Sequence, residues 1–429
     1  METTSFIRMI LMLSLTPSLY TADSTFRNQT DQMSLFAFKD SITEDPLGAL
    51  SSWNNSINLY RWHGVKCGRR HQRVVELDLR SQKLAGSISP FIGNLNFFRS
   101  IYLQDNRFQA AFGSLSKLTS LYLFSNNLHG TIPPFLGNLS LIQLLSLGQN
   151  NLEGTIPESI GYLTNLLLFG IGQNKISGTV PPSLYNISAL EGLYLLNNQF
   201  TGSLPSDIGI MLPNLRRISV GGNQFTGRFP ASFSNASGMT ILVIPRSGLF
   251  GPVPVDLGRR MNDLSTLNLG FNNLGTGVAG DLSFVDSLTN CTKLEVLALV
   301  SNGFGGVLPN SITNLSTQLR SLALGRNQFV GNIPAGISNL VNLLQLGLES
   351  NRLSGSIPFN IGMLQNLQRL SLRGNRLSGS IPESIGNLTQ IFELYLHYNN
   401  LTGSIPRSLE NLTGLQNLSV SQQPWWFFT

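Results

Sequence analysis

The sequence predicts an α/β solenoid: a stack of similar short units, each contributing one strand to a parallel sheet on the concave face. Three observations point to it. Two apolar residues separated by one other residue return fifteen times, mostly at steps of 24 residues. Asn and Gly recur at fixed distances after this pattern, and eleven of the twenty prolines occupy one position in it. Such a period is typical of repeat proteins, whose units bury their apolar faces only against their neighbours.

The first element in chain order is a short apolar stretch, "FIRMILMLSLTPSL", at residues 6–19. It is too short to cross a membrane and is typical of a secretory signal peptide, which we place at residues 1–22. No later segment approaches 18 consecutive apolar residues. We therefore expect a secreted chain that this sequence does not anchor in the membrane.

The repeats occupy residues 74–420, and each position in them has a physical reason. Within "LxL" the apolar residues alternate with exposed ones, as in a strand with one buried face. The Asn three residues after the second apolar residue can satisfy backbone groups of the neighbouring unit. The Gly lies seven residues after the second apolar residue and fits a tight bend that tolerates no side chain. The Pro lies ten residues after the same apolar residue, in the turn that follows this bend.

Two units depart from the period. The second, "LQDNRFQAAFGSLSKL", is four residues short, and we expect its strand to survive while the outer segment shortens. The ninth unit has 30 residues and should bulge at about 275–286. We expect fifteen strands, the last of them poorly formed.

Composition argues against several functions. Only 12% of the residues are charged, and the net charge of +6 is too diffuse to indicate a nucleic-acid partner. The turn "GRRHQR" at 68–73 is interpreted as solvated. The four histidines are scattered, and we find no metal-ligand spacing, cofactor motif or catalytic constellation. We therefore expect no enzyme, no cofactor and no metal.

Eleven Asn-x-Ser/Thr sequons agree with export, although "NLS" and "NLT" also belong to the repeat itself. Seven lie nine or ten residues before the second apolar residue of the next "LxL", outside the strands, where glycans would leave the strand face bare. The candidate glycosylation sites are Asn28, Asn54, Asn138, Asn186, Asn235, Asn290, Asn314, Asn387, Asn400, Asn411 and Asn417.

Binding is the default role of a concave solenoid face, and exposed aromatic and Arg side chains are typical of binding hot spots. The alternative is that Tyr suits any strand and that scattered charges keep the face soluble. The alternative is weakest for residues 369–398, where Arg, Glu, His and Tyr converge on two adjacent strands. The candidate ligand-binding residues are Tyr102, Tyr122, Phe124, Tyr194, Phe271, Arg326, Glu349, Arg369, Arg373, Glu393, Tyr395, His397 and Tyr398.

The motif "LxxLxLxxNxLxGxIPxxLGNLxxL" resembles the plant-type leucine-rich repeat. Residues 31–67 look like the N-terminal cap of plant leucine-rich-repeat receptor kinases, and we place a helical cap at 28–73. The stretch "DLSFVDSLTNCTKLEVL" is similar to the subgroup of the flagellin and elongation-factor-Tu immune receptors. The resemblance implies an ectodomain that senses a peptide or protein ligand, with a co-receptor or full-length receptor kinase as a further partner. It implies location in the apoplast or, as part of a full-length receptor, at the plasma membrane.

The sequence also departs from that family. It contains no kinase motif, and the repeats give way to a tail at 421–429, "SQQPWWFFT", so a truncated receptor is one interpretation. Similar caps carry a Cys at the position of Tyr60, paired with the Cys that matches Cys67; here we expect Cys67 and Cys291 to be free thiols. The alternative function is a secreted inhibitor of a pathogen enzyme, as with the polygalacturonase-inhibiting proteins that share this repeat.

Overall fold

The computed structural model describes residues 22–109 and 117–420, without the side chains of 22–27. The predicted signal peptide (apart from Ala22), the predicted tail and the outer part of the short second repeat therefore lie outside the described residues. By its contacts the chain divides into two compact units, residues 1–129 with 139–142 and residues 130–138 with 143–429. Each is described by itself.

The first unit begins with helix α1 (Ala22–Asp40), which covers an aromatic cluster. Trp53 and Trp62 stack with ring centroids 5.4 Å apart, and Phe36 and Phe38 of α1 pack against them at 5.0 and 6.0 Å. Lys39, in the last turn of α1, donates to the Trp53 carbonyl at 2.8 Å. These contacts close the apolar end that the first repeat would otherwise expose.

A buried ion pair joins α1 to the beginning of the first strand of the repeats. Arg73 donates to both carboxylate oxygens of Asp31, at 2.9 and 2.6 Å, and the Val74 N–H donates to the same carboxylate at 2.9 Å. Both side chains are almost fully buried. The interpretation of 68–73 as a wholly solvated turn was therefore wrong for Arg73, because its partner is 42 residues away and invisible to local sequence.

The sheet of the first unit has an antiparallel edge strand, β2 (Val65–Cys67), beside β3 (Val74–Asp78). Strands β5 (Ser100–Tyr102) and β7 (Ser120–Tyr122) follow in parallel register. The strand of the short second repeat is thus present, as predicted. The other elements are β1 (Ile42–Glu44), η1 (Leu59–Arg61), β4 (Ala85–Gly86), η2 (Pro90–Asn94) and β6 (Arg107–Phe108), while β8 (His129–Thr131) spans the boundary between the units.

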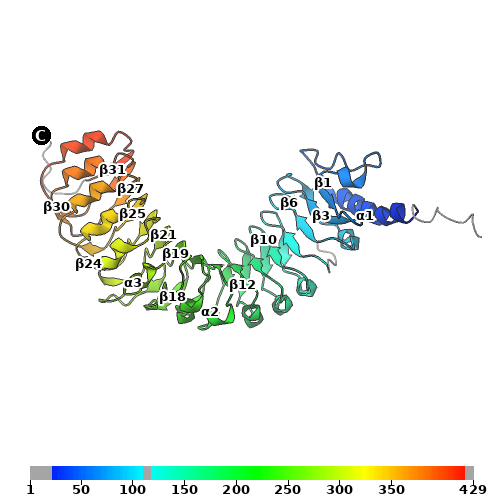
Figure 1. Cartoon of the computed structure of the whole chain (residues 1–429), viewed down its shortest axis with the longest axis horizontal. Coiled ribbons are helices and arrows are strands. Elements are labelled where there is room, and N and C mark those ends of the chain that lie inside the picture. The colour runs from blue at the N-terminus through cyan, green and yellow to red at the C-terminus, as the bar shows by residue number, and fades with distance from the viewer. Residues whose placement is uncertain (1–21, 110–116, 421–429) are drawn as a thin grey trace, which may run out of the picture. The chain divides into compact units, whose positions relative to one another are not determined.

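The second unit stacks twelve parallel strands in chain order. They are β9 (Leu144–Ser146), β11 (Leu168–Gly170), β13 (Gly192–Tyr194), β15 (Arg217–Ser219), β17 (Ile241–Val243), β19 (Thr266–Asn268), β21 (Val296–Ala298), β23 (Ser321–Ala323), β25 (Gln345–Gly347), β27 (Arg369–Ser371), β29 (Glu393–Tyr395) and β31 (Asn417–Ser419). With β3, β5 and β7 of the first unit they make the fifteen predicted strands. Of the labelled strands in this unit, β19, β21, β25, β27 and β31 line the inner side of its arc in Figure 1.

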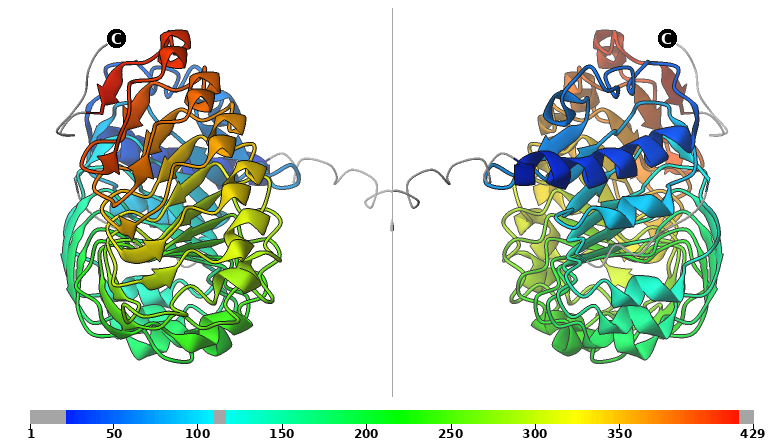
Figure 2. Two further views of the ribbon diagram at one scale, coloured as in Figure 1. Left: turned by 90° about the vertical axis from the view of Figure 1, so that its left-hand side faces the viewer. Right: turned by 90° about the vertical axis from the view of Figure 1, so that its right-hand side faces the viewer.

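A second set of strands and a series of helical turns form the rest of each repeat. The strands are β10 (Asn151–Gly154), β12 (Lys175–Gly178), β14 (Gln199–Phe200), β16 (Thr226–Arg228), β18 (Gly248–Gly251), β20 (Asn273–Leu274), β22 (Gly305–Val307), β24 (Gln328–Gly331), β26 (Arg352–Leu353), β28 (Ser378–Gly379) and β30 (Asn400–Leu401). The helical turns are η3 (Pro134–Asn138), η4 (Glu158–Tyr162), η5 (Pro182–Asn186), α2 (Ile208–Met211), η6 (Ala231–Asn235), α3 (Val285–Leu288), η7 (Asn310–Asn314), η8 (Ala335–Asn339), η9 (Phe359–Met363), η10 (Glu383–Asn387) and η11 (Arg407–Asn411). Figure 2 shows these elements in successive layers.

The core consists of the repeated leucines, which are almost completely buried from one repeat to the next; Leu370 and Leu372 are 0% exposed. Phenylalanines add a second row, in which Phe200 and Phe225 stack at 6.1 Å. Burying a Leu or Phe side chain contributes about 1.5 to 3 kcal/mol. Each layer gains this only while its neighbours are in place, so the stack is stable as a whole.

The repeated Asn forms the predicted ladder. The Asn351 amide donates to the carbonyls of Leu348 in its own repeat and Leu324 in the preceding one, at 3.1 and 3.2 Å. Its Oδ1 accepts from the Phe329 N–H at 3.1 Å. One side chain thereby satisfies three backbone groups where the chain leaves the sheet.

The repeated Gly and Pro mark the two ends of the outer segment. Gly331 and Gly355 have φ of 75° and 72°, a region that L side chains rarely adopt. The bend therefore needs Gly for its backbone angle. The Pro157 carbonyl accepts from the Ile160 N–H at 3.0 Å and so starts the helical turn η4.

The 30-residue repeat makes its extra turn at residues 275–284, as predicted. Hydrogen bonds to one carboxylate hold this turn in place. The Asp281 carboxylate accepts from the N–H groups of Thr276, Gly277 and Gly305, the last two at 2.9 Å. Burial alone would raise the pKa of Asp281, but these donors outweigh it and lower the pKa.

The expectation of a poorly formed last strand was wrong. Strand β31 pairs with β29 in full register, Leu394 opposite Leu418. A strand needs only the backbone of one neighbour to form. The two paired leucines differ in burial: Leu418 is 46% exposed, whereas Leu394 is 0% exposed.

Candidate ligand-binding face

The face is built by alternation along each strand. In β27 the buried Leu370 lies between Arg369 and Ser371, and in β29 the buried Leu394 lies between Glu393 and Tyr395. Because the strands are parallel and in register, Arg369 is opposite Glu393 and Ser371 is opposite Tyr395. Residues from different repeats thus form columns across the sheet.

The residue just before each ladder Asn has a left-handed backbone, which sequence reasoning missed. Phe271, Arg326 and Tyr398 have φ between 55° and 59°. Arg246 has φ of 51° at the same repeat position, where Ser247 replaces the ladder Asn. This region costs a non-glycine residue about 1 to 2 kcal/mol, an energy that the ladder hydrogen bonds offset. A signal was present in the sequence, because Gly222 and Gly374 occupy the same position.

The second unit contains a cavity of about 300 Å³ on this face, lined by six side chains. They come from four adjacent repeats, those of β23, β25, β27 and β29. The six residues are Arg326, Glu349, Arg369, Ser371, Arg373 and Tyr395. Together with Glu393, His397 and Tyr398 they are called the charged cluster below.

The three arginines of the charged cluster are not equivalent. Arg369 Nε lies 2.9 Å from Glu393 Oε2, and its guanidinium lies over the Tyr395 ring at 5.9 Å. The contact is an ion pair at close range and not a hydrogen bond, and Glu393 Oε2 has no hydrogen-bond partner among the described residues. Within the described residues, no carboxylate lies within 4 Å of Arg326 or Arg373, so both cations can pair with a ligand.

The Glu349 carboxylate lies against the backbone at two glycines. A Cβ on Gly325 would lie 2.4 Å from Glu349 Oε1, and one on Gly347 would lie 3.1 Å from Oε2. The carboxylate therefore occupies space that a side chain at either glycine would need. In the described part of the chain its enclosed Oε2 has no hydrogen-bond partner, so Glu349 keeps accepting capacity on a face otherwise rich in Arg.

The edge of the charged cluster is aromatic. His397 packs edge-on against Tyr398 at 4.9 Å and against Tyr395 at 6.3 Å. Tyr398 is 56% exposed. Aromatic rings with few rotatable bonds lose little entropy when a ligand packs on them, so this edge suits binding.

The other predicted residues do not join this cluster. In the first unit, Tyr102 and Tyr122 stack at 5.1 Å, Arg80 lies over Tyr102 at 5.1 Å, and Phe124 is exposed. In the second unit, Arg246 covers Phe271 at 4.4 Å, and Tyr194 is half-buried on β13. The structure brings together Arg326, Glu349, Arg369, Arg373, Glu393, Tyr395, His397 and Tyr398.

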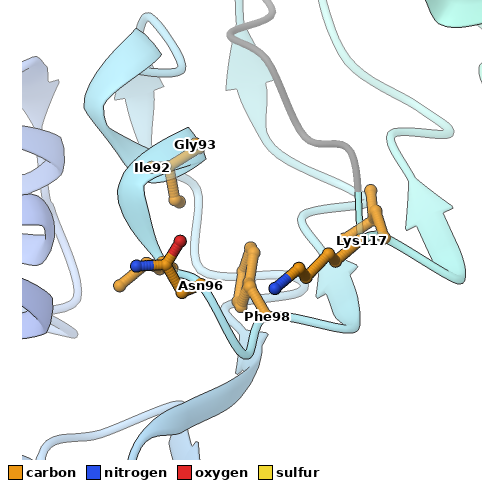
Figure 3. A pocket seen from close by; sticks show the side chains of 7 residues that line it. Ile92, Gly93, Asn96, Phe98 and Lys117 are labelled. Carbon is orange, nitrogen blue, oxygen red and sulfur yellow. The ribbon is translucent and has the colours of Figure 1, made fainter. Parts of the chain in front are cut away.

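Two other hollows lie in the first unit, away from the strand face. Figure 3 shows one of about 30 Å³ beside Ile92, Asn96, Phe98 and Lys117, room for about one water molecule. The second, of about 550 Å³, lies between α1 and η2 and is lined by Met33, Phe91 and polar neighbours. Neither carries a convergent set of charged side chains.

The sequons fall on different surfaces. The seven predicted to lie outside the strands are all exposed: Asn290 follows α3, and the others end helical turns, namely Asn138, Asn186, Asn235, Asn314, Asn387 and Asn411. Asn28 and Asn54 are half-buried, and Asn54 Oδ1 accepts from the Ser56 and Ile57 N–H groups. Asn400 is exposed on β30, and Asn417 is exposed on β31 of the main sheet.

Both cysteines are free thiols. Burial raises the pKa of Cys67 to about 11, and the nearby Asp31 carboxylate adds to this. Burial raises the pKa of Cys291 to about 12. At neutral pH both are protonated and poor nucleophiles.

Within residues 22–109 and 117–420, no helix combines the length and apolarity needed to span a bilayer. In the same ranges no three His, Cys, Asp or Glu side chains are grouped to hold a metal ion.

Comparison with known proteins identifies the repeat. Residues 28–68 match a leucine-rich-repeat N-terminal domain. Residues 117–139, 141–163 and 214–236 match single leucine-rich repeats, and 318–424 match a leucine-rich-repeat region. The chain is a leucine-rich-repeat protein of the type found in plant receptor kinases.

Among curated relatives, the receptor-like serine/threonine-protein kinase EFR of Arabidopsis thaliana is 47% identical over 88 residues. Receptor kinase-like protein Xa21 of Oryza sativa subsp. japonica is 45% identical over 82 residues. These segments cover 20% and 18% of this chain but only 8% of each relative. The matches thus concern a small part of much longer proteins.

Solved structures give the same assignment. The PEPR1–AtPEP1 complex superposes with a TM-score of 0.77 at 29% identity, over 92% of this chain and 55% of that one. The ectodomain of GASSHO1 of A. thaliana, in complex with CASPARIAN STRIP INTEGRITY FACTOR 2, gives 0.62 at 29%, over 91% and 55%. The peptide hormone receptor RGFR1 with RGF2 gives 0.56 at 27%, over 81% and 66%.

Proposed function

We propose that this chain is the extracellular, ligand-recognising part of a plant receptor-like kinase. It takes a peptide or protein ligand on its concave face and serves immune or developmental signalling. One observation carries the proposal: four adjacent repeats place Arg, Glu and Tyr side chains around a single cavity. Ligand-bound ectodomains among the similar structures support it.

The charges define what such a ligand offers. Arg326 and Arg373 have no carboxylate partner among the described residues, and Glu349 keeps an unused acceptor oxygen. A ligand that carries an acidic group and an N–H donor pairs with both: its acidic group with Arg326 or Arg373, and its N–H with Glu349. Peptides have this combination, and an extended peptide crossing the strands reaches side chains from successive repeats.

The role we propose for the module is binding, and its support is the leucine-rich-repeat fold that it shares with ligand-bound ectodomains. Its partners are the ligand and a co-receptor or full-length receptor kinase, and its place is the apoplast or the outer face of the plasma membrane. The secreted-inhibitor alternative predicts a folded pathogen enzyme as the partner and no requirement for a peptide.

The test uses the full chain, secreted from plant cells and immobilised. Apoplastic peptides are passed over the wild type, Arg373→Ala and the matched control Arg376→Ala, an exposed Arg three residues later. We expect a peptide set retained by the wild type and the control but lost from Arg373→Ala. Each peptide is then synthesised and titrated calorimetrically. Equal retention by all three proteins would remove the concave cluster as the binding site.

A further inference from the structure

One sequon lies on the same face as the charged cluster. Asn417 is the first residue of β31 and is exposed. Its register partner is Glu393 of β29, whose own partner is Arg369 of β27. Ser419, the third residue of the sequon, is opposite Tyr395. In-register parallel strands place residues of one column on one face, so Asn417 continues the column of Arg369 and Glu393.

The other exposed sequons of this unit differ in position. Six end helical turns, Asn290 follows one, and Asn400 is on the second-layer strand β30. Glycans at these positions leave the strand face open. Asn417 is therefore the sequon among the described residues from which an oligosaccharide would project beside the charged cluster.

We propose that an N-linked glycan on Asn417 borders the charged cluster and restricts access to it. In the transfer, the Asn417 amide nitrogen forms a bond to the anomeric carbon of a lipid-diphosphate-linked oligosaccharide. The bond from that carbon to the diphosphate oxygen breaks, the lipid diphosphate leaves, and the amide loses one proton. The reaction needs passage through the secretory pathway, and its consequence for ligands rests on the proposed function.

Geometry sets the size of the effect. Neighbouring strands are about 4.8 Å apart, so Asn417 is one such step from Glu393 and two from Arg369. An oligosaccharide of many sugar rings extends over more than one strand. It covers the Tyr395 and His397 edge first and leaves Tyr194 on β13, eight strands before β29 in sheet order, unaffected.

The first measurement is occupancy. The full chain is secreted from plant cells, and its glycopeptides are analysed by mass spectrometry. We expect a glycan on Asn417 in most molecules. An Asn417 peptide found unmodified would overturn the proposal.

The second measurement is access, read without any ligand by hydroxyl-radical oxidation of Tyr395. We expect the oxidation rate of Tyr395 to at least double in Asn417→Gln and in Ser419→Ala, with Tyr194 unchanged. Asn411→Gln, which removes the convex sequon of the same repeat, is the matched control and should leave Tyr395 unchanged. Trimming wild-type glycans to one N-acetylglucosamine should reproduce part of the increase without changing the sequence.

Equal Tyr395 rates in wild type, Asn417→Gln and trimmed protein would refute a restricting glycan. Both measurements are independent of ligand identity. A failure of peptide retention in the Arg373→Ala experiment therefore bears on the proposed function, and a failure here bears on the glycan.

Discussion

Arg369 is held between two residues of the neighbouring strand: its Nε lies 2.9 Å from Glu393 Oε2, and its guanidinium lies 5.9 Å from the centre of the Tyr395 ring. The pair is half exposed, so its own contribution to stability is small, about 0 to 1 kcal/mol. Its effect is on orientation. The guanidinium of Arg369 is engaged by Glu393 and Tyr395, whereas no carboxylate of the described residues lies within 4 Å of Arg373.

The first prediction concerns the contribution of Arg373 and Tyr395 to ligand binding. Arg373→Ala and Tyr395→Ala should each weaken binding of the captured peptide by about 1 to 2 kcal/mol, as for typical hot-spot truncations. Titration calorimetry measures the loss. Arg376→Ala and Tyr162→Ala are matched controls, both exposed and both outside the strand face. Similar losses in the controls would show that the ligand binds elsewhere.

The second prediction tests the ladder. Asn351→Ala leaves the buried Phe329 N–H without its acceptor, and a buried unsatisfied group costs about 1 to 3 kcal/mol. The Leu324 and Leu348 carbonyls each lose one donor and keep another, from Asn327 and Asn375 respectively. We expect faster hydrogen exchange confined to residues 324–353 and a lower unfolding temperature. Asn360→Ala, at an exposed Asn on η9, should change neither. An unchanged exchange pattern in Asn351→Ala would contradict the role of the ladder.

The third prediction concerns the turn at 275–284. Asp281→Ala removes the acceptor for three N–H groups, so hydrogen exchange at Thr276, Gly277 and Gly305 should accelerate. Asp286→Ala, exposed on α3, is the control. In the wild type the folded pKa of Asp281 is lowered, so its contribution to stability is complete above the unfolded pKa of about 3.9 and is lost as pH falls through the folded value. Exchange in this turn should therefore stay slow at pH 5 and above.

The fourth prediction concerns the thiols. Burial raises the pKa of Cys67 to about 11 and that of Cys291 to about 12, so at neutral pH the folded protein should react slowly with a thiol reagent. The unfolded, non-reduced monomer should titrate two thiols. A count of zero would mean that the two cysteines are paired, against the free thiols described above.

The fifth prediction concerns a disulfide in the N-terminal cap. Tyr60 is 51% exposed on η1, and Tyr60→Cys should pair with Cys67. Closing a loop of about seven residues is expected to stabilise the cap by about 2 to 3 kcal/mol on chain-entropy estimates. The gain should appear as slower hydrogen exchange before residue 79, with later repeats unchanged. Tyr60→Ser is the control that removes the ring without adding a thiol.

The sequence by itself determined the repeat, because each unit is specified locally. The period predicted the positions of the fifteen strands. The recurring Asn, of which Asn351 is one, predicted the hydrogen-bond ladder, and the extra residues of the long unit predicted its bulge. Parallel strands in register follow from repeated spacing alone, since equal units stack with equal offsets. For the same reason the column positions of Arg369, Glu393 and Tyr395 could be read before the structure was known.

Tertiary structure decided what depends on contacts between distant residues. The Arg73–Asp31 pair joins residues 42 positions apart, and Asp281 bonds Gly305 across a repeat. In neither pair does the sequence around one residue indicate which distant residue it contacts. The contact of the Glu349 carboxylate with the backbone at Gly325 and Gly347 also emerged only in three dimensions. Spacing fixes which residues share a face, whereas pairing, burial and free hydrogen-bonding capacity depend on what the neighbouring repeat supplies.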